Sequence, residues 1–191
     1  ILDSIHGGMS VEKTLERREG CLMVACWSPY ATGKTFVAVN LAAVASQGNK
    51  GEVLVDLDLE KRSIYTWLNI STKEDSVYRL LSGDCDAAVN YKNLFTVYGA
   101  DYQLPQREVE INAEFLQSLS RQANMIVFDL PARLEDWHTR EILQKVDVVI
   151  LIVDSDYHHC LGVKKHFGFM PRAVLVANKQ VSLVGPYNHE A

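Results

Sequence analysis

The sequence predicts a three-layer α/β/α fold, in which a mostly parallel β-sheet lies between two layers of helices. Two observations lead to this prediction. Apolar runs of strand length alternate along the chain with segments whose apolar residues recur at spacings of three and four, as in amphipathic helices. Apolar strands that alternate with helices are typical of a parallel sheet covered on both faces.

The predicted elements follow one another from Cys21 onwards. Each strand is a short run rich in Val, Ile, Leu or aromatic residues. In the first helix Val37, Leu41 and Val44 share one face, and Gly48 is a suitable stop. Strands are predicted at residues 22–27, 52–56, 93–98, 125–129, 148–153 and 173–177, and helices at residues 34–46, 63–68, 77–81, 114–123 and 137–144.

The chain is long enough for one domain of this class. Its 191 residues can bury a substantial core. We interpret residues 1–20, which are polar and charged, as a leader or linker, and residues 21–191 as the domain. The first residue is not Met, and few residues follow the last predicted strand. The possibility that the sequence is a fragment, shortened at its C-terminus, therefore stays open.

Composition and charge narrow the functional class. Apolar residues make up 48% and charged residues 23%, which is typical of globular proteins. The longest apolar run, residues 146–153, is too short to span a bilayer, and no signal peptide is visible. Four cysteines without Cys-x-x-Cys spacing indicate reduced thiols, and a net charge of −5 gives no general support for nucleic-acid binding. We expect a cytoplasmic protein that reaches a membrane only through a partner.

Residues 28–35 carry the pattern of a phosphate-binding loop. They read Ser-Pro-Tyr-Ala-Thr-Gly-Lys-Thr and lie between a predicted strand and a predicted helix. Gly33 lets the backbone approach phosphates closely, Lys34 should reach the β- and γ-phosphate oxygens, and the Thr35 hydroxyl should ligate Mg²⁺. The alternative is a structural turn or a decayed site. The residues expected to contact a nucleotide are Ser28, Tyr30, Ala31, Thr32, Gly33, Lys34, Thr35 and Phe36.

Three aspartates end two of the strands. Asp129 follows four apolar residues, which is the Walker B pattern for holding Mg²⁺ through water. Asp56 and Asp58 end the second strand and, being two residues apart, face the same side. Asp56 would lie near Mg²⁺, and Asp58 could orient a water against the γ-phosphate. The alternatives are that Asp129 caps a turn and that the other two are solvated turn residues.

With these residues in place, the sequence resembles the MinD/ParA-type partition and positioning ATPases. The resemblance implies ATP and Mg²⁺ as cofactors, dimerisation around the nucleotide, and a protein partner positioned on a membrane, a nucleoid or a large assembly. By position, Asn178 would contact the adenine edge and Asp58 would assist hydrolysis. Four segments carry the match in the family's order: Gly33-Lys34-Thr35 with Asn40-Leu41-Ala42, residues 53–58, residues 126–131, and residues 174–179.

The loop departs from the family pattern. The family has a Lys at the position of Pro29, where it reaches the partner's nucleotide, and glycines at the positions of Tyr30 and Ala31. Proline offers neither a cation nor an N–H, so the contact across the dimer is missing unless Lys61 or Arg133 replaces it. Within the family, the Ser-Pro start of the loop resembles the CpaE-like ATPases of pilus assembly.

Three hypotheses follow for function. The leading one is a slow Mg²⁺-dependent ATPase that switches between monomer and dimer, with Lys34 and Asp58 as catalytic residues. The second is a nucleotide-binding scaffold with little or no hydrolysis. The third is a phosphotransferase that uses the same loop. His158, His159 and Cys160 do not have the spacing of a metal site.

Overall fold

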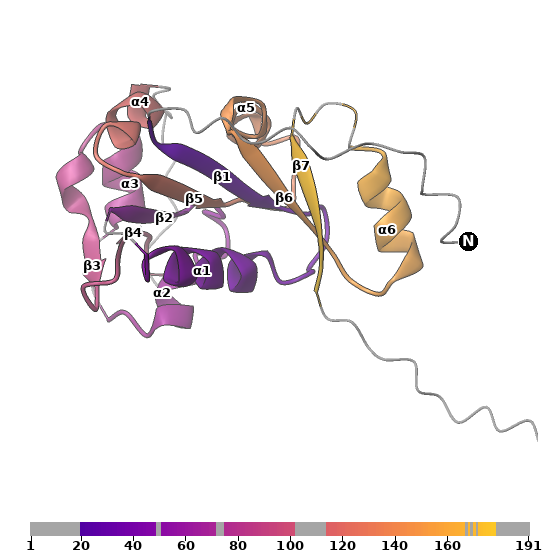
Figure 1. Cartoon of the computed structure of the whole chain (residues 1–191), viewed down its shortest axis with the longest axis horizontal. Coiled ribbons are helices and arrows are strands. Elements are labelled where there is room, and N and C mark those ends of the chain that lie inside the picture. Colours follow the sequence, from indigo (N-terminus) through magenta and orange to yellow (C-terminus); the bar gives the residue numbers. More distant parts are fainter. Residues whose placement is uncertain are drawn as a thin grey trace, which may run out of the picture.

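The computed structural model describes residues 20–48, 51–71, 75–101, 114–166, 168, 170 and 172–178. Its helices and strands are arranged as shown in Figure 1. The strands are β1 (Leu22–Trp27), β2 (Glu52–Asp56), β3 (Val89–Tyr91), β4 (Phe95–Tyr98), β5 (Met125–Asp129), β6 (Val148–Val153) and β7 (Ala173–Ala177). The helices are α1 (Lys34–Ala45), α2 (Ile64–Leu68), α3 (Ser76–Leu81), α4 (Glu114–Ser120), α5 (Trp137–Lys145) and α6 (Tyr157–Lys164), with a 3₁₀ turn η2 (Cys85–Ala87).

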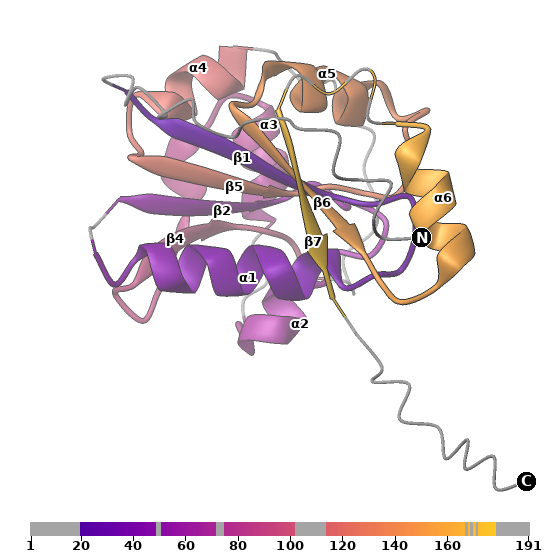
Figure 2. The ribbon, with the colours of Figure 1, turned by 45° about the vertical axis from the view of Figure 1, so that its right-hand side comes forward.

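The strands form one seven-stranded sheet in the order β3-β4-β2-β5-β1-β6-β7. Every neighbouring pair is parallel except β3 and β4, which are antiparallel. The hydrophobic side chains divide into one core on each face of the sheet. Ala25 and Trp27 of β1 belong to the core shared with α3, α4, α5 and α6, whereas Cys26 belongs to the core shared with α1 and α2. Figure 2 shows α1 and α2 on one face of the sheet and α4 and α5 on the other. The predicted three-layer α/β/α fold is confirmed.

Strand β3, the 3₁₀ turn η2 and helix α6 were not predicted, and strand β4 begins later than expected. Lys92 and Asn93 have positive φ values of 51° and 59° and form the turn between β3 and β4, so the predicted strand at 93–98 begins at Phe95. Helix α6 escapes prediction because it is largely exposed and places only Val163 in the core. In α1 the deeply buried face consists of Ala38 and Ala42, while Val44 is 63% exposed.

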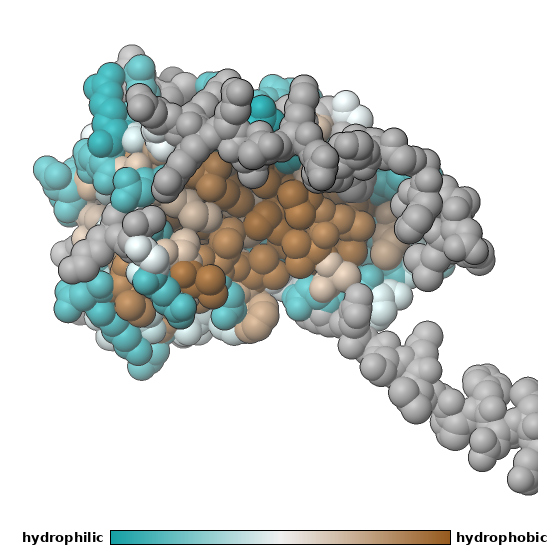
Figure 3. All heavy atoms as spheres, in the orientation of Figure 1, coloured by the Kyte–Doolittle hydropathy of each residue, from teal (hydrophilic) through white to brown (hydrophobic). Residues whose placement is uncertain are grey.

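Strand β7 forms one edge of the sheet. Its residues Val174 and Leu175 are 52% and 54% exposed. Figure 3 shows apolar side chains gathered at the centre of the face where β1, β6 and β7 lie in Figure 1. Within the described ranges, no helix combines the length and apolarity needed to cross a bilayer. Residues 1–19 of the predicted leader and the residues after Asn178 lie outside the described residues.

Candidate nucleotide site

The sheet brings the predicted site residues to one edge. In a parallel sheet the carboxyl ends of the strands meet at the same edge, where ligands bind in open α/β folds. The strand register aligns Asp56 of β2 with Asp129 of β5, and Asp129 with Cys26 of β1. The loop that follows β1 therefore lies beside both aspartates and leads directly into α1.

The loop closes on its own polar groups before α1 begins. Gly33 has the left-handed conformation, with φ 91° and ψ 36°, and is the N-cap residue of α1. The buried Ser28 hydroxyl accepts a hydrogen bond from the Tyr30 N–H at 3.2 Å. A side chain at position 33 would be strained in this conformation. The strand–loop–helix context predicted for phosphate binding is thus present, with a helix N-terminus behind the loop.

Lys34 is held inside this loop. Its side chain is buried, and Nζ donates a hydrogen bond to the Tyr30 carbonyl oxygen at 3.1 Å. Burial lowers the pKa of Lys34 from its usual range, and the nearby Asp129 opposes this effect. A buried ammonium group beside backbone N–H groups is the cation that a phosphate loop needs.

Thr35 and Asp129 form the pair expected to hold Mg²⁺. The Thr35 hydroxyl donates to Asp129 Oδ2 at 2.6 Å and also lies 3.2 Å from the Ser63 hydroxyl. Asp129 Oδ1 is buried and has no hydrogen-bond partner among the described residues. Burial raises the pKa of Asp129 to about 7, although the hydrogen bond from Thr35 opposes the rise.

This donor set fits a hard cation. A hydroxyl oxygen and an unused carboxylate oxygen lie next to a predicted phosphate site, and Mg²⁺ prefers such ligands, together with water and phosphate oxygens. The described residues hold no group of three or more His, Cys, Asp or Glu side chains with metal-binding geometry.

Asp56 and Asp58 lie beside this pair and brace the following loop. Asp56 is fully buried, and its two oxygens accept the N–H groups of Asp58 at 3.2 Å and Ile64 at 3.1 Å. Burial and the neighbouring Asp129 raise the pKa of Asp56 well above its usual value. Asp58 accepts the N–H of Lys61 at 3.2 Å. Asp56 thus fastens the start of α2, and its contact with a metal ion stays a prediction.

The two basic residues considered as replacements for the missing lysine occupy neighbouring loops. Lys61 follows β2, and its Nζ lies 3.8 Å from Asp58 Oδ2. Arg133 follows β5 and pairs with Glu60 at 2.7 Å. Both basic side chains are more than half exposed, at 61% and 62%. They lie at the surface beside the site, paired with acidic groups of the loop after β2.

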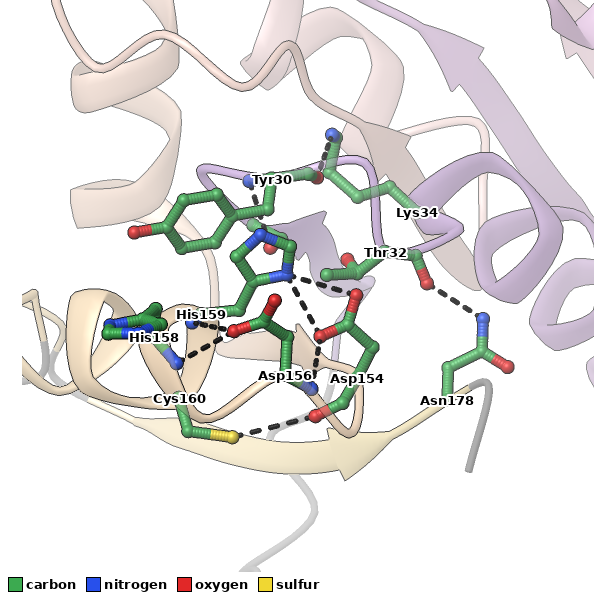
Figure 4. A network of polar contacts seen from close by, with 10 residues as sticks. Tyr30, Thr32, Lys34, Asp154, Asp156, His158, His159, Cys160 and Asn178 are labelled. Atoms are coloured by element: carbon green, nitrogen blue, oxygen red, sulfur yellow. Dashed lines mark hydrogen bonds and ion pairs between the residues drawn. The ribbon is translucent and has the colours of Figure 1, made fainter. Parts of the chain in front are cut away.

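Asn178 and Phe36 are placed differently from the loop residues. The Asn178 side chain follows β7 and donates from Nδ2 to the Thr32 carbonyl oxygen at 2.8 Å (Figure 4). Its predicted contact with adenine stays a prediction, because this amide group holds the phosphate loop. The Phe36 ring is 44% exposed and packs against Trp67 at 5.9 Å between ring centroids.

Sequence reasoning missed the contacts on the other side of the loop. The Tyr30 ring stacks on His159 of α6, with centroids 4.0 Å apart and an angle of 17° between the planes. His159 Nδ1 in turn lies 2.9 Å from Asp154 Oδ1 (Figure 4). The sequence did contain one signal for helix α6, because an aspartate after a strand is a common N-cap residue. Asp156 caps α6 by accepting hydrogen bonds from the N–H groups of His158 and His159.

Comparisons with known proteins found a relative in sequence and several solved structures with a similar fold. No protein-family model matches the chain. A candidate tyrosine-protein kinase in the cps region of Klebsiella pneumoniae is 32% identical over 137 residues. The match covers 67% of this chain but only 18% of that protein, so the chain corresponds to a small part of its relative.

Several solved structures share the fold. The MinC:MinD cell division protein complex of Aquifex aeolicus matches with a TM-score of 0.66 and 16% identity over 82% of this chain and 68% of that chain. A plasmid partition protein of Borrelia burgdorferi gives 0.62 and 19% over 82% and 77%. The septum site-determining protein MinD of Pyrococcus horikoshii, complexed with Mg-ADP, gives 0.62 and 16% over 82% and 70%. The fold is that of MinD/ParA-type P-loop proteins.

Proposed function

We propose that this chain belongs to the MinD/ParA-type ATPases, binds ATP with Mg²⁺ at the loop of residues 28–35 and hydrolyses it slowly. The observation that carries the proposal is the hydrogen bond from Thr35 to Asp129, because it joins the end of the phosphate loop to the end of β5 beside the buried ammonium of Lys34. The Mg-ADP complex of the Pyrococcus MinD neighbour supports the choice of ligand.

Each residue has a part in this function. Lys34 and the N–H groups at the start of α1 stabilise negative charge on the phosphates. Thr35 and Asp129 would hold Mg²⁺, which would supply positive charge to neutralise the phosphates. Asp58 is buried and lies two residues after the end of β2. It orients the attacking water and receives its proton. The nucleotide-bound form dimerises and regulates a protein partner in the cytoplasm or, through that partner, at a membrane.

Binding and turnover of ATP, measured side by side, test the proposal. We expect Lys34→Ala to weaken Mg-ATP binding by about 30-fold or more, because it removes a buried charge that pairs with phosphate. Lys92→Ala is the matched control, since Lys92 is exposed in the β3–β4 turn. Binding by wild type without any turnover would support the scaffold alternative, with Pro29 as its cause. Failure of wild type to bind Mg-ATP would refute the central proposal.

A second candidate is transfer of the γ-phosphoryl group to a tyrosine hydroxyl. It is favoured by the 32% identity to the candidate tyrosine-protein kinase of Klebsiella pneumoniae. The same loop would bind the nucleotide, and the acceptor oxygen would be that of tyrosine in place of water. The two activities separate by product: hydrolysis releases phosphate in the amount of ADP formed, whereas the kinase leaves it as phosphotyrosine on the chain or on an added tyrosine peptide.

A further inference from the structure

We propose that Tyr30, His159 and Asp154 form a clamp that positions the phosphate loop from the side of α6. The loop differs from the glycine-rich family pattern at Pro29, Tyr30 and Ala31, of which Tyr30 is the middle residue. His159 lies 129 residues further along the chain. The proposal rests on nucleotide binding by this loop. It assigns Tyr30 and His159 as positioning residues, because their side chains act on the loop and on Lys34.

Two aspartates, Asp154 and Asp156, hold His159 in place beneath the Tyr30 ring. His159 Nδ1 lies 2.9 and 3.0 Å from the two oxygens of Asp154, which can only accept, so Nδ1 carries the proton in this pair. Asp156 caps α6 through the His158 and His159 N–H groups and so fixes the backbone beneath the ring. His159 therefore offers a rigid surface on which the Tyr30 ring stacks.

The hydrogen bonds of Asp154 favour its ionised form. Burial would raise the pKa of Asp154, but the Asp156 N–H and the His159 ring outweigh it and hold this pKa below its usual value. An ionised Asp154 fixes the orientation of the His159 ring. The Cys160 thiol completes the arrangement by donating to the Asp154 carbonyl oxygen at 3.5 Å.

The clamp reaches the phosphate site through the main chain of Tyr30. The Tyr30 N–H donates to Ser28, and the Tyr30 carbonyl oxygen accepts from Lys34 Nζ (Figure 4). A displaced ring would move both groups, and with them the ammonium group that is to meet the phosphates. Where the family has flexible glycines, this chain fixes the same loop by an aromatic contact.

Gly162 shows how closely the ring fits against α6. A Cβ atom at this position would lie 1.9 Å from the Tyr30 hydroxyl oxygen and 2.8 Å from Cζ. Replacement of a glycine inside a helix by alanine normally stabilises the helix by about 0.5–1 kcal/mol. Gly162→Ala therefore displaces the Tyr30 ring without weakening α6.

The test measures Mg-ATP affinity and Tm for the full chain and its variants. We expect Tyr30→Ala, His159→Ala and Gly162→Ala each to weaken binding about three- to tenfold, as loss of one aromatic contact would. Tyr30→Phe keeps the stack and should bind within about twofold of wild type. His158→Ala, which alters the exposed neighbour, is the matched control and should bind like wild type.

Two results separate the clamp from a general loss of structure. Gly162→Ala should lower affinity without lowering Tm, and it should have no further effect on affinity in a Tyr30→Ala background. Equal affinity of wild type, Tyr30→Ala and His159→Ala would overturn the clamp while leaving nucleotide binding intact. A fall in affinity that only follows a fall in Tm would also overturn it. Absence of binding by wild type would instead refute the proposed function, and the clamp with it.

Discussion

The two sides of the phosphate loop are built by different means. On one side Asp56 and Asp129 are buried at the ends of β2 and β5, and Thr35 at the start of α1 donates to Asp129. On the other side Tyr30 stacks on His159, which is 31% exposed on its side chain. Buried carboxylates without full pairing cost folding free energy, whereas an aromatic stack contributes a little. In the proposed function the first side therefore takes part in the reaction, and the second side positions the loop.

This difference suggests how each side responds to substitution. Changes on the acidic side should alter turnover, metal use and the pH dependence of stability. Changes beside the stack should alter affinity alone, and by smaller factors, because a single contact holds the loop there. The following predictions test this division, beginning with the largest expected effect.

Asp58→Asn should lower ATP turnover about 100-fold or more while leaving Mg-ATP affinity within about threefold. The amide keeps the shape of the carboxylate but cannot take a proton from the attacking water. Single-turnover and binding measurements on the same preparation separate the two effects. Asp86→Asn is the control, because Asp86 is exposed in the turn after α3. Unchanged turnover in Asp58→Asn would assign the residue to the structure of the loop.

The pH dependence of stability should reveal Asp129. Its pKa is raised from 3.8 to about 7 in the folded state, so its protonated form is favoured by folding. The stability that it contributes is present below the unfolded pKa and is lost as pH rises through about 7. Between pH 5 and 8, without Mg²⁺, we expect the free energy of unfolding to fall by on the order of 2 kcal/mol from this group.

Asp129→Asn should remove most of this pH-dependent loss. Asp56, whose pKa is also raised, contributes a loss of the same sign that remains in the variant. Denaturant unfolding of both proteins at several pH values measures the difference. Parallel curves for wild type and variant would show that Asp129 is already ionised at low pH, contrary to its burial.

The sequence predicted the acidic side better than the aromatic side, and the reason is the range of the contacts. Asp129 and Gly33-Lys34-Thr35 belong to local patterns in which a strand leads into a polar residue or a loop, and parallel pairing brings such ends together. The stack joins Tyr30 to a helix that carries too few buried residues to show periodicity. Asp56 was predicted at the end of the second strand and lies there, but its hydrogen bond to the α2 backbone depends on the path of the loop.

Thr35→Ala should weaken Mg²⁺-dependent ATP binding about tenfold, because it removes the hydroxyl that bonds to Asp129 and is expected to ligate the metal ion. Thr35→Ser keeps that oxygen and should restore most of the affinity. Titrations with and without Mg²⁺ check the assignment, since the loss should disappear without the metal ion. A loss of the same size under both conditions would show that Thr35 acts on the loop alone.

Asn178→Ala should have the smallest effect, about two- to fivefold in affinity, the cost of one hydrogen bond. The variant distinguishes two roles that the position of the residue allows. If Asn178 acts only through its bond to Thr32, ATP and GTP affinities fall by the same factor, because both nucleotides carry the same phosphates. If it also contacts the base, ATP affinity falls more than GTP affinity. Equal losses would place Asn178 with His159 among the residues that hold the loop, and unequal losses would place it with the residues that choose the ligand.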